Sequence, residues 1–272
     1  MTPQNRYKIG IAGLGYVGGA VRHWFEENKA LLFLYDKYKN IGSLDELNKA
    51  DVVFICLPTP FCEEKNRGCD DSAIQEVLLQ ITGEKTIVIK STVLPGSTEN
   101  YQKSFPQHKF LMNPEFLRAK TATEDFLKPE RQIIGYTAGN QDAAKEVLDI
   151  LPQAPFQKIV KAKEAEMIKY FGNTFLANRV VFANQMYDIC QKLGIDYEVV
   201  KDCAGADPRI GTAHFDIFHE GYRGFSGSCL PKDTKAFAQF ANNHLEMNLK
   251  LFKIIQDIND ELLNGNKKNE EG

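Results

Sequence analysis

Short apolar runs, each ended by glycine, proline or a polar cluster, recur through the first half of the chain. They occupy residues 8–14, 31–36, 51–58, 86–92, 109–114 and 131–137. Residues at helical spacing lie between most of these runs, as with Val17, Val21, Trp24 and Phe25. Near-continuous apolar strands separated by helices are typical of a parallel sheet covered by helices on both faces. We therefore expect residues 1–155 to form one doubly wound α/β domain.

The second half of the chain has a helical pattern. Residues 164–194 contain no proline and no turn signal before Gly194, and their apolar residues keep one face throughout, which predicts a single long helix. Shorter helical patterns follow at 196–204, 233–242 and 243–263. We expect a helical domain over 156–263 and a disordered polar tail over 264–272. The long helix and the 243–263 segment have more apolar face than one chain readily covers, which predicts a homodimer.

A glycine-rich turn, Gly13-x-Gly15-x-x-Gly18, joins the first predicted strand to the first predicted helix. Glycines in this context let the turn tighten and let the backbone approach a pyrophosphate at the helix N-terminus. Asp36 ends the second predicted strand, where an acid would hold the ribose hydroxyls. The first domain is therefore predicted to be a Rossmann-type NAD-binding domain. Lys37 and Lys39 leave NADP open.

Composition narrows the class of protein. The 272 residues carry a formal net charge of -3, which gives no sign of general affinity for nucleic acid or anionic membranes. No apolar run is long enough to span a bilayer, and the first residues lack the apolar core of a signal peptide. The six cysteines have no framework spacing, which indicates reduced thiols and a cytoplasmic location. Cys62 and Cys69 share a loop without a paired histidine or cysteine nearby, so we expect no metal site.

One cysteine stands out in the stretch GFSGSCLPKD, residues 224–233. Gly224 and Gly227 would allow a substrate to approach closely. A helix that starts after Pro231 would direct its positive end at Cys229. Together with a nearby Lys169 or Lys232, that field would favour the thiolate. The alternative is an inert cysteine in a loop, and we expect Cys56 and Cys190 to be of that kind, buried in core faces.

Lys169 and Asn173 lie four residues apart on the predicted long helix and so share one face. They could be an ordinary solvated pair, or they could present several hydrogen-bond donors to one developing oxyanion.

Seven motifs occur in order along the chain: GLGYVG, FICLPTP, IKSTVLPGST, NPEFLR, EAEMIKYFGNTFLANRVVFAN, DPRIG and GSCLPKDTK. Together they resemble the nucleotide-sugar dehydrogenase family, most closely the UDP-glucose 6-dehydrogenases. The resemblance implies oxidation of a sugar primary alcohol to a carboxylate by two NAD, without release of the aldehyde. UDP-glucose is the expected substrate, UDP-glucuronate the expected product and polysaccharide biosynthesis the expected context.

The resemblance also implies roles for individual residues. Cys229 would be the nucleophile, Lys169 and Asn173 would steady the oxyanions, and Asp233 and Glu115, assisted by Thr92, would manage protons and the hydrolytic water. The implied cofactor-binding residues are Gly13, Gly15, Tyr16, Val17, Gly18, Asp36, Pro58, Thr59, Ser91, Thr92 and Lys232. The implied substrate-binding residues are Glu115, Phe116, Leu117, Arg118, Lys169, Asn173, Phe225, Gly227 and Arg209, the last reaching across the dimer to a neighbour's substrate.

The chain departs from the family pattern in three places and ends before the second nucleotide-binding fold that usually grips the UDP. Ser226 replaces an expected glycine, residues 119–120 replace an acidic residue and glycine, and the stretch between Arg209 and Cys229 is a few residues longer. A partner chain could supply the missing fold. Two alternatives remain open: a compact two-domain hydroxyacid-type dehydrogenase, which needs no cysteine, and a catalytically silent NAD-binding subunit.

Overall fold

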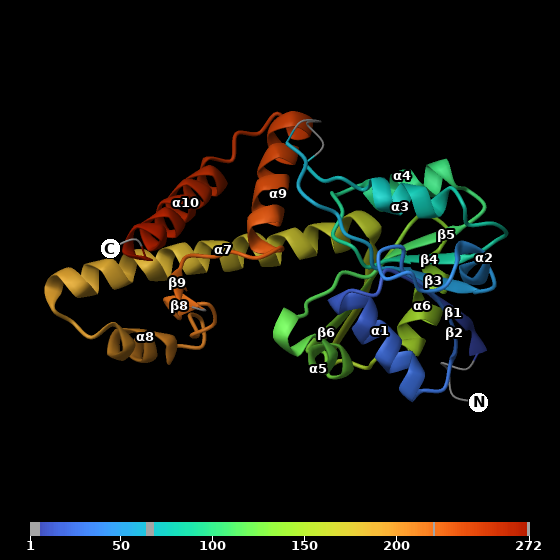
Figure 1. The fold of residues 1–272 in the computed structure, drawn as a ribbon, viewed down its shortest axis with the longest axis horizontal. Helices are drawn as coiled ribbons and strands as arrows, with labels where there is room; N and C mark the ends of the chain where they lie inside the picture. The colour runs from blue at the N-terminus through green and yellow to red at the C-terminus, as the bar shows by residue number, and fades with distance from the viewer. Residues whose placement is uncertain (1–5, 64–67, 220, 271–272) are drawn as a thin grey trace. The chain divides into compact units, whose positions relative to one another are not determined.

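The computed structural model describes residues 6–63, 68–219 and 221–270, which divide into two compact units (Figure 1). The first unit comprises Met1–Pro60 and Cys69–Lys169. The second comprises Phe61–Gly68 and Tyr170–Gly272. Within the described residues, no helix is both long enough and apolar enough to cross a bilayer.

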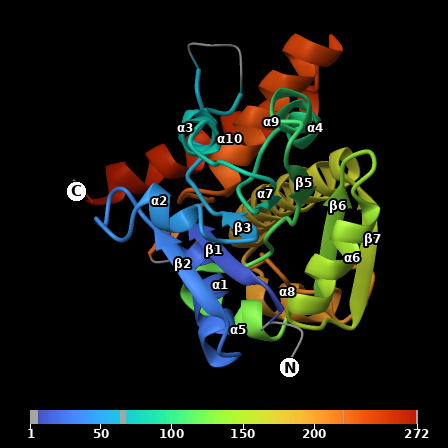
Figure 2. The ribbon, with the colours of Figure 1, turned by 90° about the vertical axis from the view of Figure 1, so that its right-hand side faces the viewer.

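The first unit is built on a seven-stranded sheet with the order β2-β1-β3-β4-β5-β6-β7 (Figure 2). Its strands are β1 Lys8–Ala12, β2 Leu31–Tyr35, β3 Val52–Ile55, β4 Thr86–Ile89, β5 Lys109–Met112, β6 Arg131–Tyr136 and β7 Phe156–Lys161. Its helices are α1 Tyr16–Glu27, α2 Leu44–Leu47, α3 Ser72–Leu78, α4 Ser97–Ser104, a 3₁₀ turn Ala119–Thr121, α5 Ala122–Leu127 and α6 Gln141–Ile150. The six predicted strands and the Rossmann-type architecture are confirmed.

The sheet departs from the prediction in two ways. The pair β5–β6 is antiparallel, whereas every other neighbouring pair is parallel. The strand β7 was missed, because it is an edge strand whose residues are mostly half-buried or exposed and so show no apolar run. It pairs with β6 along its whole length, so the sheet continues beyond residue 155, where the sequence placed the end of the first domain.

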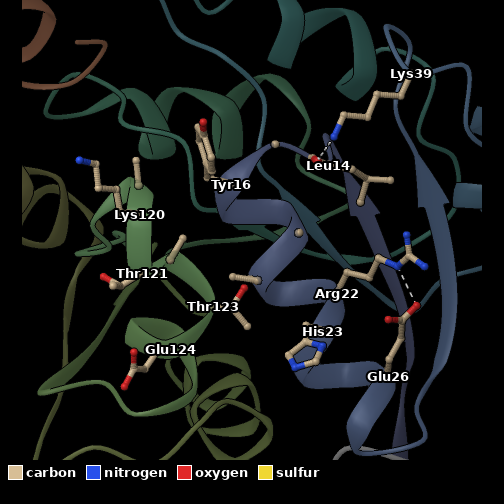
Figure 3. Close-up of a pocket in the computed structure, with 15 residues that line it drawn as sticks. Leu14, Tyr16, Arg22, His23, Glu26, Lys39, Lys120, Thr121, Thr123 and Glu124 are labelled. Carbon is tan, nitrogen blue, oxygen red and sulfur yellow. Dashed lines mark hydrogen bonds and ion pairs between the residues drawn. The ribbon is translucent and has the colours of Figure 1, made fainter. Parts of the chain in front are cut away.

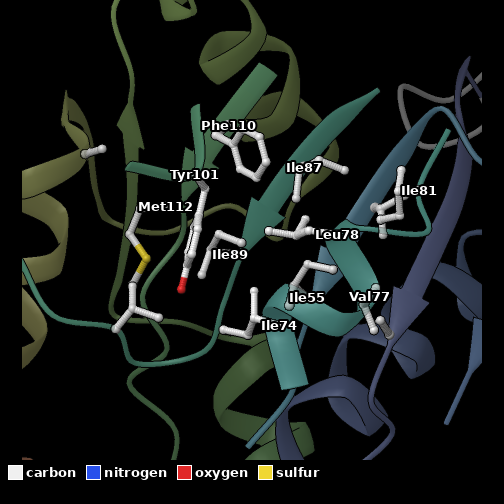
Figure 4. Close-up of a cluster of buried hydrophobic side chains, with 14 of the residues drawn as sticks. Ile55, Ile74, Val77, Leu78, Ile81, Ile87, Ile89, Tyr101, Phe110 and Met112 are labelled. Atoms are coloured by element: carbon white, nitrogen blue, oxygen red, sulfur yellow. The ribbon is translucent and has the colours of Figure 1, made fainter. Parts of the chain in front are cut away.

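The strands feed two separate cores, one on each face of the sheet. Successive side chains of a strand point to opposite faces. Accordingly, Val53 and Ile55 of β3 join one cluster with residues of α3 and α4, while Val52 and Phe54 join the other with residues of α1, α5 and α6. Figure 4 shows the first cluster and Figure 1 the helices on the two sides of the sheet. Burial on both faces explains why these strands read as continuous apolar runs.

The predicted long helix is confirmed as α7, Ala162–Leu193, and it ends at Gly194, which has a φ of +65°. Its first residues belong to the first unit and the rest to the second. The second unit adds α8 Tyr197–Gly205, a hairpin of β8 Phe218–His219 and β9 Tyr222–Arg223, α9 Leu230–Leu245 and α10 Lys250–Glu270. The hairpin was not predicted, because two-residue strands leave no periodic signal.

The last two helices differ from the predicted bounds. Glu246 adopts a left-handed conformation and ends α9, so α10 begins at Lys250 and not at 243. The backbone of α10 continues to Glu270, past residue 263 where the sequence pattern placed the end of this helix, and residues 271–272 lie outside the described part of the chain. A helix already started by an apolar segment gains one hydrogen bond for each further residue, so polar residues can extend it.

Candidate active site

The three glycines of the turn between β1 and α1 serve different purposes. Gly13 has a φ of +87°, and a Cβ there would lie 2.5 Å from the carbonyl oxygen of Cys56. A Cβ at Gly18 would lie 1.8 Å from the carbonyl oxygen of Gly13, so both positions exclude any side chain. A Cβ at Gly15 would meet nothing within 4 Å, and no side chain caps α1 there. The N-terminus of α1 is therefore open to an anion such as a pyrophosphate.

Asp36 lies beside this turn at the end of β2. Its carboxylate accepts a hydrogen bond from the backbone N–H of Leu14 at 2.8 Å and from that of Lys39 at 2.9 Å. Burial opposes ionisation, but these backbone donors outweigh it and lower the pKa of Asp36. An ionised carboxylate has acceptor positions beyond these two, which suits ribose hydroxyls. The Lys39 ammonium donates to the Leu14 carbonyl at 2.6 Å.

A pocket of about 1010 Å³ lies between α1 and the segment 119–124 (Figure 3). Its wall includes Leu14, Gly15 and Tyr16 from the glycine turn together with Lys39. Figure 3 shows Thr123 directed toward α1 across this space, whereas the Lys120 ammonium points away from that helix. The open glycine, the ionised acid and the pocket together fit a dinucleotide cofactor.

The loops after β3 and β4 are tied to each other. Thr59 donates from its hydroxyl to the Thr92 carbonyl at 2.7 Å, and Ser91 donates to the Leu57 carbonyl at 2.7 Å. Pro58 next to them is exposed. Since the carboxyl ends of parallel strands share one edge of a sheet, these predicted cofactor residues lie on the same edge as the glycine turn.

Glu115 and Lys169 form a buried ion pair between the loop after β5 and α7. The Lys169 ammonium donates to Oε1 of Glu115 at 2.7 Å, and the backbone N–H of Leu117 donates to Oε2 at 2.7 Å. Burial would raise the pKa of Glu115, but the charge and hydrogen bond of Lys169, the Leu117 N–H and the Lys90 charge together outweigh it and lower the pKa. The pair thus joins a carboxylate held ionised to an ammonium that can donate to a further acceptor.

The substrate residues after Glu115 have partners of their own. The Arg131 guanidinium lies 3.8 Å from the centre of the Phe116 ring, and Arg118 forms an ion pair with Asp125 at 2.6 Å. Leu117 packs against the core cluster of α1. None of these contacts prevents a role for the backbone of the loop in binding.

In the second unit, the Asp233 carboxylate accepts hydrogen bonds from two of the predicted site residues. It is 1 % exposed, and it accepts a hydrogen bond from the Asn173 amide at 2.5 Å and one from the Lys232 ammonium at 2.5 Å. Asn173 lies on α7 four residues after Lys169, so the predicted one-turn spacing is realised on a continuous helix. Lys232 is thereby paired with its neighbour in the sequence.

Cys229 is exposed and is the N-cap residue of α9. The helix starts at Leu230, with Pro231 in its first turn, which corrects the predicted start after Pro231. The Cys229 sulfur has Ser228 Oγ at 3.6 Å as a neighbour. Its proximity to Lys169 or Lys232 therefore stays a prediction, and the ammonium groups of both lysines form ion pairs with carboxylates, Lys169 with Glu115 and Lys232 with Asp233.

The loop before Cys229 divides into a packed part and an open part. A Cβ at Gly224 would lie 2.7 Å from the Asn259 side chain, so this glycine permits packing and not substrate approach. Phe225 is 5 % exposed and lies in the core between α7 and α10, which argues for a structural role. Gly227 has a φ of +79° and open space around its Cβ position. Arg209 is exposed and pairs with Asp207 at 2.6 Å.

Sequence reasoning missed two buried charged residues next to these groups. Lys90 at the end of β4 is 2 % exposed and donates to the Asn113 side chain at 2.7 Å, and burial lowers its pKa to about 8. Glu166 on α7 has no exposed surface. A charge at the end of an apolar run was the available signal for Lys90. As expected, Cys56 and Cys190 pack with core clusters, and burial raises the pKa of Cys56 to about 12.

The described residues contain no group of three or more histidine, cysteine, aspartate or glutamate side chains that could hold a metal ion.

Comparison with known proteins places this arrangement in a class. Residues 39–151 match the NAD binding domain of the UDP-glucose/GDP-mannose dehydrogenase family, and residues 163–261 match the family's central domain. The fold combines the NAD binding domain and the central domain of that family. The chain belongs to the UDP-glucose/GDP-mannose dehydrogenase family, and its first unit carries the NAD-binding domain of that family.

Matches to individual proteins support the same family assignment. The chain is 36 % identical over 217 residues to UDP-glucose 6-dehydrogenase of Rickettsia conorii, covering 76 % of this chain and 48 % of the relative. A UDP-glucose dehydrogenase structure from Pyrobaculum islandicum superposes with a TM-score of 0.83 at 28 % identity, covering 94 % of this chain and 68 % of that one. A Pyrococcus horikoshii UDP-D-ManNAc dehydrogenase has a TM-score of 0.80 at 19 % identity, which shows the shared fold. The chain spans about half the length of the curated relatives it matches.

Proposed function

We propose that this chain carries out the NAD-dependent four-electron oxidation of a nucleotide sugar, with UDP-glucose as substrate and UDP-glucuronate as product. The observation that carries the proposal is the placement of Cys229. Cys229 is the N-cap residue of α9, and its exposed thiol lies four residues before Asp233, the buried carboxylate to which Asn173 donates. A hydroxyacid-type dehydrogenase needs no such cysteine, and family membership weighs against that alternative.

The first oxidation converts the primary alcohol to an aldehyde. NAD, when bound, supplies the acceptor for the hydride in each of the two oxidations. Lys169 would donate a hydrogen bond to the oxygen on which negative charge develops. Glu115, kept ionised by Lys169, would take the hydroxyl proton, directly or through a water molecule.

The second oxidation proceeds on Cys229. The sulfur forms a bond to the aldehyde carbon, the thiol proton passes to solvent through Asp233, and the aldehyde oxygen gains a proton, which gives a thiohemiacetal. Loss of a hydride and a proton leaves a thioester. Water activated by Glu115 then attacks the carbonyl carbon, the carbon–sulfur bond breaks, and the sulfur regains its proton as the acid leaves. Asn173 would donate to the oxyanion in these steps.

The test is a screen for NADH release with UDP-glucose, UDP-N-acetyl sugars and GDP-mannose. Two NADH per UDP-glucose support the proposal, and release with another sugar nucleotide alone would correct the substrate. A flat result with every sugar nucleotide would favour the catalytically silent subunit. A partner chain that completes the site would then have to be sought.

NAD is expected to bind at least about tenfold more tightly than NADP, because the ionised Asp36 would repel a 2′-phosphate. Asp36→Ala should narrow that gap. Calorimetric titration of both cofactors measures it, and Asp51→Ala, which removes a carboxylate that caps the exposed Lys8 N–H, is the control. NADP binding as tight as NAD in the unaltered chain would refute the assignment.

We also infer a homodimer formed through α7. Phe171, Phe175, Phe182, Ile189 and Leu193 are 50 % to 68 % exposed and recur at intervals of four or seven residues, the spacing of a helix-pairing stripe. Phe182→Asp is expected to dissociate the dimer, since it places a charge in that stripe, whereas Leu79→Asp, at an exposed apolar position on the first unit, should not. Sedimentation velocity measures the oligomeric state of both variants and of the unaltered chain. A monomer at micromolar concentration with full activity would contradict the inference.

We further infer a reducing, cytoplasmic location, which the free thiols Cys203 and Cys229 on the surface support.

A further inference from the structure

Glu166 is a buried carboxylate to which the proposed mechanism gives no role. It has no exposed surface, and both of its oxygens are occupied. Oε2 accepts from the backbone N–H of Gly96 at 2.5 Å, and Oε1 accepts from the backbone N–H of Thr98 at 2.8 Å and from its hydroxyl at 2.7 Å. These donors stabilise a charge that would otherwise be costly to bury.

The donors belong to the first turn of α4. Gly96 caps that helix with a φ of +100° and offers no side chain, so Glu166 supplies the missing acceptor from another element. Residues 90–96 link β4 to α4 and contain Thr92. The Thr92 carbonyl is held by the Thr59 hydroxyl at 2.7 Å. The loop is thus fixed by Thr59 near its start and by Glu166 at its end.

The same turn of α7 also carries Lys169. Glu166 and Lys169 lie three residues apart and are therefore neighbours on the helix surface. Lys169 reaches the loop after β5 through Glu115 at 2.7 Å. The first turns of α7 thus fasten the loops after β4 and β5 together, at the edge of the sheet where a dinucleotide binds.

We propose that Glu166 is a positioning residue: through its hydrogen bonds to Gly96 and Thr98 it fixes the Thr92 loop relative to Lys169. The inference rests on the proposed function for the meaning of Thr92 and Lys169, but the geometry that it explains is independent of the substrate. Glu166 itself touches no reactant.

The surrounding charges make the hydrogen bonds of Glu166 to Gly96 and Thr98 sensitive to pH. Glu99 on α4 opposes ionisation of Glu166 and is itself paired with Lys163 of α7 at 3.2 Å, while Tyr101 of α4 also faces the carboxylate. Burial raises the pKa of Glu166 to about 7. Because this pKa exceeds that of an unfolded glutamate, ionisation costs folding stability as the pH rises toward 7. Full acceptor strength toward α4, in contrast, is present only above pH 7.

The decisive variant is Glu166→Gln in the full chain. A glutamine has the same shape, but its amide nitrogen would face the Gly96 N–H. Two hydrogen-bond donors would then meet at that position, and the hydrogen bond from Gly96 would be lost. Glu99→Gln is the matched control, because it removes a nearby carboxylate that is paired at the surface and leaves the cap intact. Thermal unfolding shows whether each variant is folded.

Two measurements follow. Covalent labelling of lysines, read by mass spectrometry, should show Lys169 reacting about tenfold faster in Glu166→Gln, the size of effect expected for losing a charge-assisted hydrogen bond. Lys85, which is 9 % exposed and donates to the carbonyls of Asn48 and Ala50, lies outside this loop and should stay unreactive. Calorimetry between pH 6 and 8 should show NAD affinity rising with pH in the unaltered chain and in Glu99→Gln, and weak, pH-independent affinity in Glu166→Gln.

Unchanged Lys169 labelling would overturn the proposal, as would an equal rise at Lys85, which would indicate general loosening. If the unaltered chain fails to bind NAD, the proposed function fails, while the labelling still decides the role of Glu166. Should Glu166→Gln not fold, Thr98→Val removes only the hydroxyl donor and should shift Lys169 labelling in the same direction by a smaller factor.

Discussion

Replacing Cys229 by serine is expected to abolish most steady-state turnover while NAD affinity stays near that of the unaltered chain. The first hydride transfer needs a cofactor, a base and an oxyanion site, all of which remain. The second needs a sulfur adduct, and a serine hydroxyl is a far poorer nucleophile and acyl leaving group at neutral pH. The reaction should stall at the aldehyde level or at a covalent adduct. The measurement is NADH formed per substrate consumed, with mass spectrometry of residue 229.

Cys203→Ser is the matched control, because Cys203 is the other exposed cysteine among the described residues. It should retain two NADH per substrate at the original rate. If Cys229→Ser also gave two NADH per substrate at an undiminished rate, the thiol would be a bystander and the covalent route would be wrong.

Replacing Lys169 by alanine is expected to slow both oxidations by about 10²- to 10³-fold, the usual cost of removing one oxyanion donor. The loss has a second part, since Glu115 would remain buried without its cation. Burial would then dominate, and the pKa of Glu115 would rise instead of lying below its usual value. The acid limb of the pH–rate profile should therefore move to higher pH.

Single-turnover measurements of each oxidation separate this variant from Cys229→Ser, which should spare the first step. Lys192→Ala, at an exposed position on the last turn of the same helix, is the control for a change of charge on α7. If Lys169→Ala slowed only the second oxidation, Lys169 would have no role in the first oxidation.

Local patterns predicted most of the fold because the forces that shape it are local. The strands β1 and β3 to β5 are buried on both faces, so their apolar runs were visible, and α7 has a long uninterrupted helical period. The reversal of β6 against β5 left no trace, since strand direction depends on where the chain between them crosses. The end of α9 depends on a left-handed Glu246, a residue type that carries no turn signal.

The candidate site could be predicted as residue types but not as contacts. Lys169 and Glu115 are 54 positions apart, and Asn173 and Asp233 are 60 apart, so only the folded chain pairs them. These pairings also bear on the prediction that a lysine lies beside the Cys229 thiol. Both lysines named for that role form ion pairs with carboxylates instead. Glu166 was overlooked because a glutamate at the start of a helix is ordinarily solvated, and its burial follows from the approach of α4.

The antiparallel direction of β6 also provides a site where a second protein or a tag can be inserted into the chain. Because β6 runs against β5, the turn after β6 emerges at the opposite edge of the sheet from the glycine turn and the loops after β3, β4 and β5. In that turn Ala138 and Gly139 are exposed, and Gly139 has open space around it, while Thr137 and Asn140 anchor the two ends to Gln102. An affinity tag, a fluorescent protein or a surface tether inserted between Ala138 and Gly139 would project from the edge remote from the cofactor, so the chain can be immobilised or followed in cells with its catalytic edge unobstructed.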